Sequence, residues 1–483
     1  MYLAVALFLV LLAVATTWRR PKDFPPGPAS LPLVGSFFSV PLRSIHVAME
    51  SLRRRHGPVV GVMFGPRPVV LVAGAAAVRE VLRRDEFQAR PELFFFKARG
   101  FGKRLGVVFS DGDLWMEQRR FALRHLRDFG FGKTSMDAIM HEEVMELFKE
   151  LRKNSCFQVS GVFNKCMVNV LWTVMAGRRF SYQDEKFLEI LRFVYKSFRA
   201  NIPGGLLVNV MPFLRFIIPK FSGYEESMEY VTGLQNILRD TIKEHRETFD
   251  GQEPRDFIDV YLQEIEKQKH SADTTFTDES LIVLCIDLFI AGSDTVSNSL
   301  EFCLMYMVLY PEVQRAVQEE LDAVIGRNHK PSIADMSRLP YFEAVIAEVS
   351  RINVVVPVPP PHRCTRQATI NGYVIPQDTT MFINLWAVMH DEEHWGDPGR
   401  FRPERFLDAE GRFARDPWLS VFGLGKRACL GESLARASLC VFFASLLQGF
   451  SLRLPEGDPP PSTRSRPGLT ATPQPFRVEL TPR

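Results

Sequence analysis

Helical periodicity dominates the hydrophobic pattern of this chain. Residues 141–269 repeat an amphipathic helical pattern with short polar breaks. Residues 432–447 place apolar side chains at helical spacing, and residues 281–309 form one long apolar run. These stretches predict a protein built mostly of helices.

Patterns typical of strands are confined to short runs. Residues 59–63 and 68–72 flank Gly65-Pro66 and predict a β-hairpin. Residues 476–480 alternate as an edge strand would. The predicted fold class is therefore mainly α with a small β region, an α+β arrangement.

The long apolar run at 281–309 could suggest a membrane span, but it contains Asp287, Asp294 and Glu301. Ionisable residues inside a membrane helix are costly, so a buried core helix is favoured. Their seven-residue spacing places the three acids near one face of the helix.

The first 18 residues are interpreted as a membrane anchor. No positive charge precedes the apolar residues 1–15, whereas three follow within four positions, at Arg19, Arg20 and Lys22. Eighteen helical residues span about 27 Å, close to the hydrocarbon core of a bilayer. The positive-inside rule places the N-terminus in the lumen and the rest in the cytosol. A signal peptide cleaved after Ala15 is the alternative. Residues 19–28 form a basic, proline-rich hinge.

Composition narrows the class of protein. A chain of 483 residues suggests two or three domains by length alone, and 46% hydrophobic residues with 39 Phe provide for a large core and an apolar cavity. A net charge of +3 argues against a nucleic-acid partner. The seven cysteines are dispersed without a C-x-x-C pair, which fits reduced thiols facing the cytosol.

The strongest chemical signal is Phe-Gly-Leu-Gly-Lys-Arg-Ala-Cys-Leu-Gly at 422–431. Cys429 ends a glycine-rich loop just before a predicted helix, and Arg427 stands two residues away. The helix dipole and the cation are both expected to lower the thiol pKa. Gly425 and Gly431 are expected to leave room for a planar ligand. Such a thiolate can serve as an axial ligand of haem iron; a buried structural cysteine is the alternative.

This loop resembles the haem-ligand loop of the cytochrome P450 family, Phe-x-x-Gly-x-Arg-x-Cys-x-Gly, and matches every fixed position. The resemblance extends over essentially the whole chain after the anchor. It implies one large, mostly helical haem-thiolate catalytic domain over residues 29–483. It also implies that the cofactor is haem b (iron protoporphyrin IX), with the Cys429 thiolate as axial ligand.

Trp115 and Arg119 lie four residues apart on one face of a predicted helix, and both are hydrogen-bond donors. The pair resembles the family's Trp-x-x-x-Arg, which binds a haem propionate; a packed Trp beside a surface salt bridge is the alternative. Arg90, His362 and Arg427 match family positions that give further propionate contacts.

Ala291-Gly-Ser-Asp294-Thr295 lies at the centre of the long apolar helix. A Thr hydroxyl inside a helix can bond the carbonyl four residues back and open a groove there, and small residues leave room for dioxygen. The motif resembles the family's oxygen-activation site, which implies proton delivery by Thr295 and Asp294. Val296 departs from the second Thr of many relatives. A buried Thr bonded only to the backbone is the alternative.

Other positions are assigned by the same resemblance. Glu348 and Arg351, with Arg405, resemble the family's structural network behind the haem and are not expected to be catalytic. Candidate substrate contacts are Phe95, Ala291, Val355, Val356 and Thr472. Phe95 belongs to a run of three Phe that could equally be core.

A basic stripe at Arg120, Arg124 and Arg127, with Lys133 beyond it, could dock an acidic electron-transfer partner or simply face solvent. The chain has no Gly-rich dinucleotide fingerprint of its own. The resemblance therefore implies electrons from a separate NADPH–cytochrome P450 reductase, with cytochrome b5 as a further candidate donor.

Within the family the chain is similar to animal microsomal members, and most like arthropod ones, at residues 94–106, 124–132 and 430–436. This implies a monooxygenase on the cytosolic face of the endoplasmic reticulum membrane, using O2 and a lipophilic substrate. The most specific hypothesis is epoxidation of methyl farnesoate to juvenile hormone. An ecdysteroid or steroid hydroxylase, or a broad xenobiotic monooxygenase, is the alternative. A haem sensor without turnover and an isomerase that needs no O2 are disfavoured by the intact Asp294-Thr295 pair.

Overall fold

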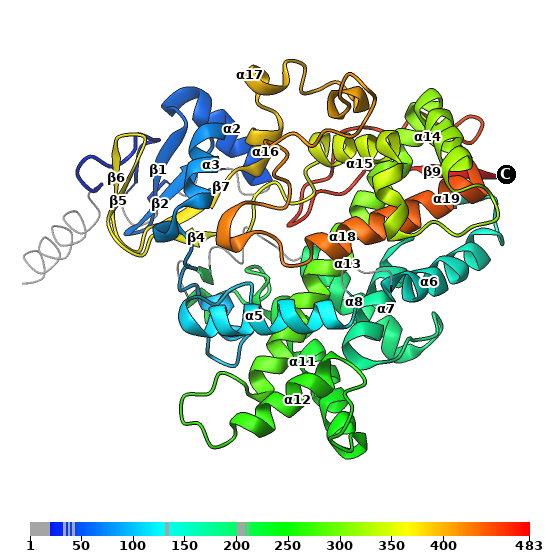
Figure 1. The fold of residues 1–483 in the computed structure, drawn as a ribbon. Coiled ribbons are helices and arrows are strands. Elements are labelled where there is room, and N and C mark those ends of the chain that lie inside the picture. The colour runs from blue at the N-terminus through cyan, green and yellow to red at the C-terminus, as the bar shows by residue number, and fades with distance from the viewer. Residues whose placement is uncertain are drawn as a thin grey trace, which may run out of the picture.

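The computed structural model describes residues 20–31, 35–36, 39–40, 44–130, 135–199, 208–209 and 212–483. Helices fill most of the molecule, which confirms the predicted fold class (Figure 1). The helices are α2 (Ile45–His56), α3 (Ala75–Arg83), α4 (Phe94–Ala98), α5 (Gly112–Asp128), α6 (Ser135–Leu151), α7 (Asn164–Ala176), α8 (Glu185–Arg199), α10 (Leu214–Ile217), α11 (Tyr224–Thr248), α12 (Phe257–Gln268), α13 (Asp278–Leu309), α14 (Pro311–Val324), α15 (Pro340–Ile352), α16 (Leu385–Met389), α17 (Glu392–Trp395), α18 (Glu432–Ser438), the π turn η7 (Leu439–Phe443) and α19 (Ala444–Gly449).

Three small sheets complete the fold. Their strands are β1 (Val59–Phe64), β2 (Arg67–Val72), β3 (Cys156–Gln158), β4 (His362–Arg363), β5 (Ala368–Ile370), β6 (Tyr373–Ile375), β7 (Thr380–Ile383), β8 (Phe450–Arg453) and β9 (Arg477–Pro482). The orders are β1-β2-β7-β4, β3-β9-β8 and β5-β6. In Figure 1 the four-stranded sheet lies with α2 and α3 at one side of the molecule, and β9 lies near the C-terminus at the other.

The predicted hairpin is present as β1 and β2, which pair antiparallel around Gly65, a residue with φ of +60°. The predicted edge strand is wrong in its position, because β9 pairs with β3 on one side and with β8 on the other. The alternation arises from the two faces of the sheet, with Val478 and Leu480 buried. Alternation reports which face is covered and does not distinguish an edge strand from a central one.

The hinge packs against the first sheet. Within residues 20–28, the Arg20 guanidinium donates to the Gly27 carbonyl at 3.2 Å and also to the Gly61 carbonyl on β1. The Gly61 N–H in turn donates to the carbonyl of Pro26 at 2.9 Å. The predicted anchor at residues 1–18, Lys133, and residues 201–207 and 210–211 of an apolar connection lie outside the described residues.

Helix α13 runs through the core. It begins at a capped N-terminus, where the Thr277 hydroxyl accepts from the Ser280 N–H, and most of its side chains are buried. Among the described residues it is the one helix long and apolar enough to cross a membrane, and most of it is enclosed by the protein. Asp287 forms an ion pair with Arg99 at 2.7 Å. The expectation of a core helix is therefore met, with its acids paired inside the fold.

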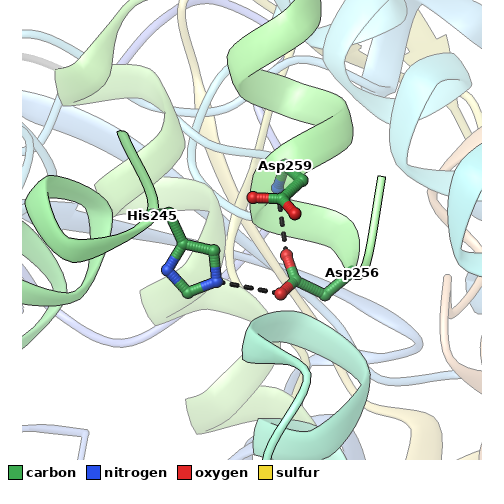
Figure 2. Close-up of side chains that lie close together, drawn as sticks. All are labelled: His245, Asp256 and Asp259. Carbon is green, nitrogen blue, oxygen red and sulfur yellow. Dashed lines mark hydrogen bonds and ion pairs between the residues drawn. The ribbon is translucent and has the colours of Figure 1, made fainter. Parts of the chain in front are cut away.

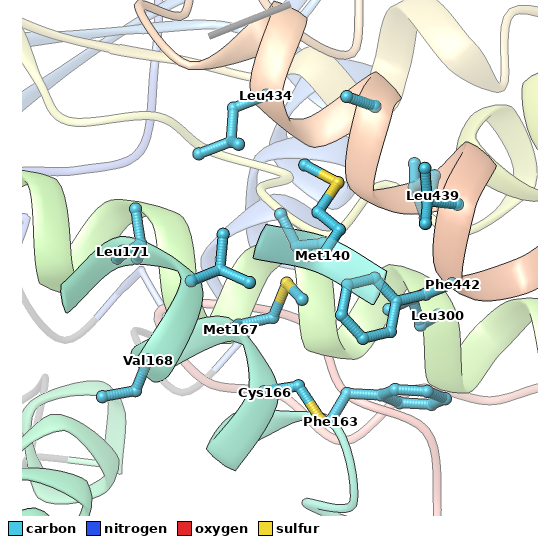
Figure 3. Close-up of a cluster of buried hydrophobic side chains, with 14 of the residues drawn as sticks. Met140, Phe163, Cys166, Met167, Val168, Leu171, Leu300, Leu434, Leu439 and Phe442 are labelled. Carbon is cyan, nitrogen blue, oxygen red and sulfur yellow. The ribbon is translucent and has the colours of Figure 1, made fainter. Parts of the chain in front are cut away.

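The helix predicted at 432–447 crosses the same core. It is continued through the π turn η7, in which all five residues are buried. Figure 3 shows where it meets α6, α7 and α13, with Leu434, Leu439 and Phe442 facing Met140 and Leu300. Each fully buried side chain of this kind contributes about 1.5–3 kcal/mol relative to an exposed one. This packing fixes the start of α18, and hence the cysteine loop that precedes it.

A buried polar cluster joins α11 to α12 (Figure 2). The His245 Nε2 lies 2.8 Å from the Asp256 carboxylate, and its Nδ1 lies 2.8 Å from the Thr241 carbonyl. Asp256 also caps α12 by accepting from the Asp259 N–H at 3.0 Å. The side chains of His245, Asp256 and Asp259 are of types that bind metal ions, and they lie close together. However, both carboxylate oxygens of Asp259 accept hydrogen bonds from the guanidinium of Arg255. The cluster is therefore a structural link between the helices.

We expect this link to depend on pH. Burial lowers the pKa of His245, but the hydrogen bond and charge of Asp256 outweigh burial, so its pKa is raised. A raised pKa stabilises the fold below the unfolded-state value, and that stabilisation is lost as pH rises through the folded-state value. His245→Gln should therefore lower the thermal midpoint more at pH 6 than at pH 9. Hydrogen bonds to charged groups contribute about 1.5–3 kcal/mol.

Exposed His270 provides the control. His270→Gln should leave the midpoint unchanged at both pH values. An equal loss from His245→Gln at pH 6 and pH 9 would contradict the assignment of a charged His245.

Candidate active site

The cysteine loop is a tight turn against α3. The Cys429 N–H donates to the Phe422 carbonyl at 2.8 Å, which closes the loop. Gly425 has φ of +71°, and a Cβ there would lie 2.2 Å from the Leu82 carbonyl oxygen. Gly425 is thus required by the backbone and by α3, whereas a Cβ at Gly431 would meet nothing within 4 Å. Gly425 therefore does not serve the expected role of leaving room for a planar ligand, whereas the open space beside Gly431 is compatible with that expectation.

The electrostatics of Cys429 also differ from expectation. Burial raises the pKa of the thiol, and a hydrogen bond from the Gly431 N–H and the charge of Arg119 lower it only in part. Arg427 is turned away, because its guanidinium donates to the carbonyls of Gln88 at 2.7 Å and Ser110 at 2.9 Å. The protein alone therefore does not favour the thiolate. A cation bound at the sulfur would favour the thiolate, because a thiol that coordinates a metal ion is deprotonated.

Basic and donor side chains from three distant segments gather beside this loop. Arg119 on α5 donates to the Ala428 carbonyl at 2.7 Å. The guanidinium of Arg427 stacks on the Trp115 ring at 3.8 Å. Arg90 donates to the carbonyl of Pro360 at 2.7 Å, which joins it to the segment before β4. The structure brings together the five residues expected to hold the propionates: Arg90, Trp115, Arg119, His362 and Arg427.

This cluster fits an anionic ligand. Burial, reinforced by Arg90, lowers the pKa of Arg427 to about 8, and burial lowers the pKa of Arg90 to about 10. Burial and the same arginines lower the pKa of His362. The Trp115 Nε1 and one Arg427 nitrogen are buried donors without an acceptor. Two carboxylates would supply both the missing charge and the missing acceptors, as the propionates of haem do.

One face of α13 lies open although the helix is in the core. The side chain of Ala291 is exposed and that of Thr295 is partly exposed, while Ser293 and Val296 between and beside them are buried. The Thr295 hydroxyl donates to the Ala291 carbonyl at 2.7 Å, in the predicted i−4 arrangement. Cys429 also has solvent-accessible surface.

Gly292 does not share this face. A Cβ at Gly292 would lie 2.9 Å from a methyl group of Leu171, so Gly292 allows α7 to pack closely against α13. Of the two small residues expected to leave room for dioxygen, only Ala291 lies on the open face.

These features combine a candidate cysteine ligand, a cluster that fits two carboxylates and a core helix with a partly exposed Thr. The family model described as Cytochrome P450 matches residues 25–480. The chain belongs to the cytochrome P450 family.

Relatives support the same assignment across the whole length. A farnesoate epoxidase of Bombyx mori is 37% identical over 489 residues, which cover 100% of this chain and 98% of the relative. Cytochrome P450 2D6 of Pan paniscus is 38% identical over 494 residues, covering 100% and 98%. Cytochrome P450 2U1 of Rattus norvegicus is 35% identical over 508 residues, covering 99% and 95%. This chain is a P450 monooxygenase, whose cofactor is a haem with a cysteine thiolate as axial ligand.

Asp294, the acid of the candidate proton-delivery pair, accepts hydrogen bonds from two side chains outside that pair. Asp294 is buried, and one of its carboxylate oxygens accepts from the Thr470 hydroxyl at 2.5 Å and from the Asn298 amide at 2.8 Å. Thr295 instead bonds within its own helix. Neither Thr470 nor Asn298 was predicted. Asn298 follows Asp294 by one helical turn and could have been found by that spacing, whereas no pattern signals that Thr470 lies beside Asp294.

The candidate substrate contacts of this P450 differ in exposure. Val355 and Val356 are partly exposed, and the Val355 carbonyl accepts from the Ala471 N–H at 2.8 Å. Thr472 is buried. Phe95 is partly buried and packs against the main core, with its N–H donating to the side chain of Asn209 at 2.8 Å. This position is compatible with Phe95 as a core residue and with Phe95 as a substrate contact.

Glu348 forms ion pairs with both Arg351 and Arg405, as the resemblance predicted. Glu348 and Arg351 are fully buried and joined at 2.7 Å, and Arg405 reaches Glu348 at 3.0 Å. Arg351 also donates to the carbonyls of Met389 and Pro398, both at 2.8 Å. The network therefore ties α15 to the segments on either side of α17, which is a structural arrangement.

Arg427 allows a test of the propionate assignment. Arg427→Met removes a buried cation that stacks on Trp115, so the purified protein should retain less haem. The haem-to-protein ratio, measured by pyridine haemochromogen absorbance, should fall several-fold. Lys426→Met is the matched control, because Lys426 is exposed and pairs with exposed Asp85. Equal haem content in the two variants would contradict the assignment.

Proposed function

We propose that this P450 epoxidises methyl farnesoate to juvenile hormone by inserting one oxygen atom of O2. The observation that carries the substrate is the similarity to a farnesoate epoxidase over the whole of both chains. The partly exposed Val355 and Val356 suit a slim apolar ester. The alternative is an ecdysteroid or steroid hydroxylase, or a broad xenobiotic monooxygenase, because the same catalytic residues would act on whichever substrate the pocket binds.

The residues of the chain have separate roles in the proposed reaction. When bound, the haem supplies dioxygen activation and oxygen-atom transfer. Cys429 would ligate its iron through the thiolate. The propionates would be held by Arg90, Trp115, Arg119, His362 and Arg427. The Thr295 hydroxyl, on the open face of α13, would pass protons into the haem site, and the Asp294 carboxylate would supply them. Ala291 leaves space beside Thr295.

Electrons come from NADPH–cytochrome P450 reductase, with cytochrome b5 as a further donor. Arg120, Arg124 and Arg127 support this proposal, because all three are exposed on α5, the helix that carries Trp115 and Arg119. Positive charge on that helix would complement an acidic partner and speed its association.

The protein is placed in the endoplasmic reticulum membrane with its catalytic domain in the cytosol. The apolar residues 1–15 support this proposal. So do large apolar side chains that are exposed in and around α10, where Phe216 is 75% exposed. The exposed residues are Phe213, Phe216, Ile217 and Phe221.

Product analysis tests the substrate. Microsomes containing the full-length protein and the reductase should convert methyl farnesoate to an epoxide only with NADPH, and Cys429→Ser should abolish the product. Farnesoic acid is assayed in parallel, since the relative is named for farnesoate. A normal reduced-carbonyl spectrum without either epoxide would reject the substrate but keep the monooxygenase. The assay would then turn to ecdysteroids and xenobiotics.

Thr295→Ala tests proton delivery. General acid catalysis contributes about 10²–10⁴-fold, so product per NADPH should fall and hydrogen peroxide should rise. Ser299→Ala is the matched control, because Ser299 lies one turn further along and its hydroxyl also bonds the carbonyl four residues back, at 2.9 Å. Unchanged coupling in Thr295→Ala would remove Thr295 from the mechanism.

A further inference from the structure

A short turn near the C-terminus joins two parts of the candidate pocket. Arg466 and Thr472 pair across the turn, with the Arg466 N–H donating to the Thr472 carbonyl at 2.7 Å. Between them, Leu469 is 49% exposed and Thr470 is buried. The Ala471 N–H donates to Val355, a candidate substrate contact. The turn therefore presents an apolar side chain at its tip while its next two residues are bonded inward.

The inward bond of Thr470 reaches the catalytic helix. Its hydroxyl donates to Asp294 at 2.5 Å, the length typical of a charge-assisted O–H···O⁻ bond. The Asn298 amide donates to the same oxygen at 2.8 Å and lies 3.4 Å from the Thr470 hydroxyl. All three side chains are buried. A hydroxyl can donate one hydrogen bond, and here the Thr470 hydroxyl donates it to the Asp294 carboxylate.

We propose that Thr470 is a positioning residue for proton delivery, which fixes the Asp294 carboxylate and couples it to the turn that carries Leu469. The coupling follows from distance, because a strong bond of 2.5 Å cannot survive a displacement of the turn by 1 Å. Substrate that presses on Leu469 or on Val355 would thus change how Asp294 is held. This inference rests on the proposed role of Asp294 in proton delivery.

Coupling between substrate and acid would serve the reaction. Protons delivered without a correctly placed substrate consume NADPH and release peroxide. A carboxylate held by the turn that carries the candidate contact Thr472 keeps its placement only while that turn keeps its position. Misplacement of a catalytic group by about 1 Å can cost about 100-fold.

The test compares three variants of the full-length holoenzyme. Thr470→Val keeps the shape of the side chain and removes the donor, and Thr470→Ser restores a hydroxyl. Ser297→Ala is the control, because Ser297 is buried on the same helix and its hydroxyl bonds its own backbone at 2.8 Å. The substrates are methyl farnesoate and, independently of the proposed function, a fluorogenic alkoxycoumarin.

We expect Thr470→Val to lower product per NADPH by about tenfold and to raise peroxide. The substrate-induced spectral shift should keep its midpoint concentration, so that binding is preserved. Product supported by iodosylbenzene, which donates an oxygen atom without proton delivery, should match the wild type. Thr470→Ser should recover the coupling, and Ser297→Ala should not lose it.

Amide hydrogen exchange gives a readout without turnover. In the ferric, substrate-free enzyme, Thr470→Val should speed exchange at residues 466–472, and Thr470→Ser should not. Wild-type coupling and exchange in Thr470→Val would overturn the proposal, and so would equal losses in Thr470→Val and Ser297→Ala. Failure of the proposed substrate appears separately, as wild-type enzyme that oxidises alkoxycoumarin but forms no epoxide.

Discussion

The guanidinium groups of Arg90 and Arg427 are buried together, and the cost of that arrangement governs the layout of the site. Burial lowers the pKa of both groups, and the charge of Arg119 adds to this effect at Arg90, as the charge of Arg90 does at Arg427. The nearby carboxylate of Asp111 is already engaged by Arg104 at 2.9 Å and by Arg363 at 3.0 Å. A fold that holds unmatched positive charge in its interior needs an anionic ligand to compensate it. The same reasoning applies to Cys429, whose thiolate needs a cation. Haem supplies both, with carboxylates at its edge and iron at its centre.

The second constraint is that α13 carries three acids through the core. Each is paired with a different segment of the chain. Asp287 accepts from the N–H groups of Val107 and Val108 as well as pairing with Arg99, Asp294 binds Thr470, and Glu301 accepts from the Gly161 N–H at 2.5 Å. A buried carboxylate is tolerated only when such donors surround it. The seven-residue spacing therefore lets one helix fasten three loops that are far apart in the sequence.

Sequence patterns predicted the contacts between residues that lie close together in the sequence. The β1–β2 hairpin, the bond from Thr295 to the carbonyl four residues back and the pairing of Glu348 with Arg351 all involve neighbours along the chain. The cysteine loop was found because the resemblance fixes each of its positions. The patterns did not reveal the contact of Gly425 with Leu82, the orientation of Arg427 away from the thiol or the bond from Thr470 to Asp294. Those contacts join residues 170 or more positions apart, and a single sequence carries no signal of such proximity.

Two of these acid links, those of Asp287 and Asp294, also relate the candidate substrate contacts to the proposed proton delivery. The segment around Val107, the turn around Thr470 and the strand-like segment at Val355 are joined to α13 or to one another by hydrogen bonds under 3 Å. Packed interiors transmit small displacements because they contain few voids to absorb them. A substrate that shifts one of these segments therefore shifts the groups that position Asp294, on the same helix as Thr295. Under the proposed roles of Asp294 and Thr470, shape selection in the pocket and proton delivery are parts of one connected structure, and a substitution chosen to change the first should also alter the second.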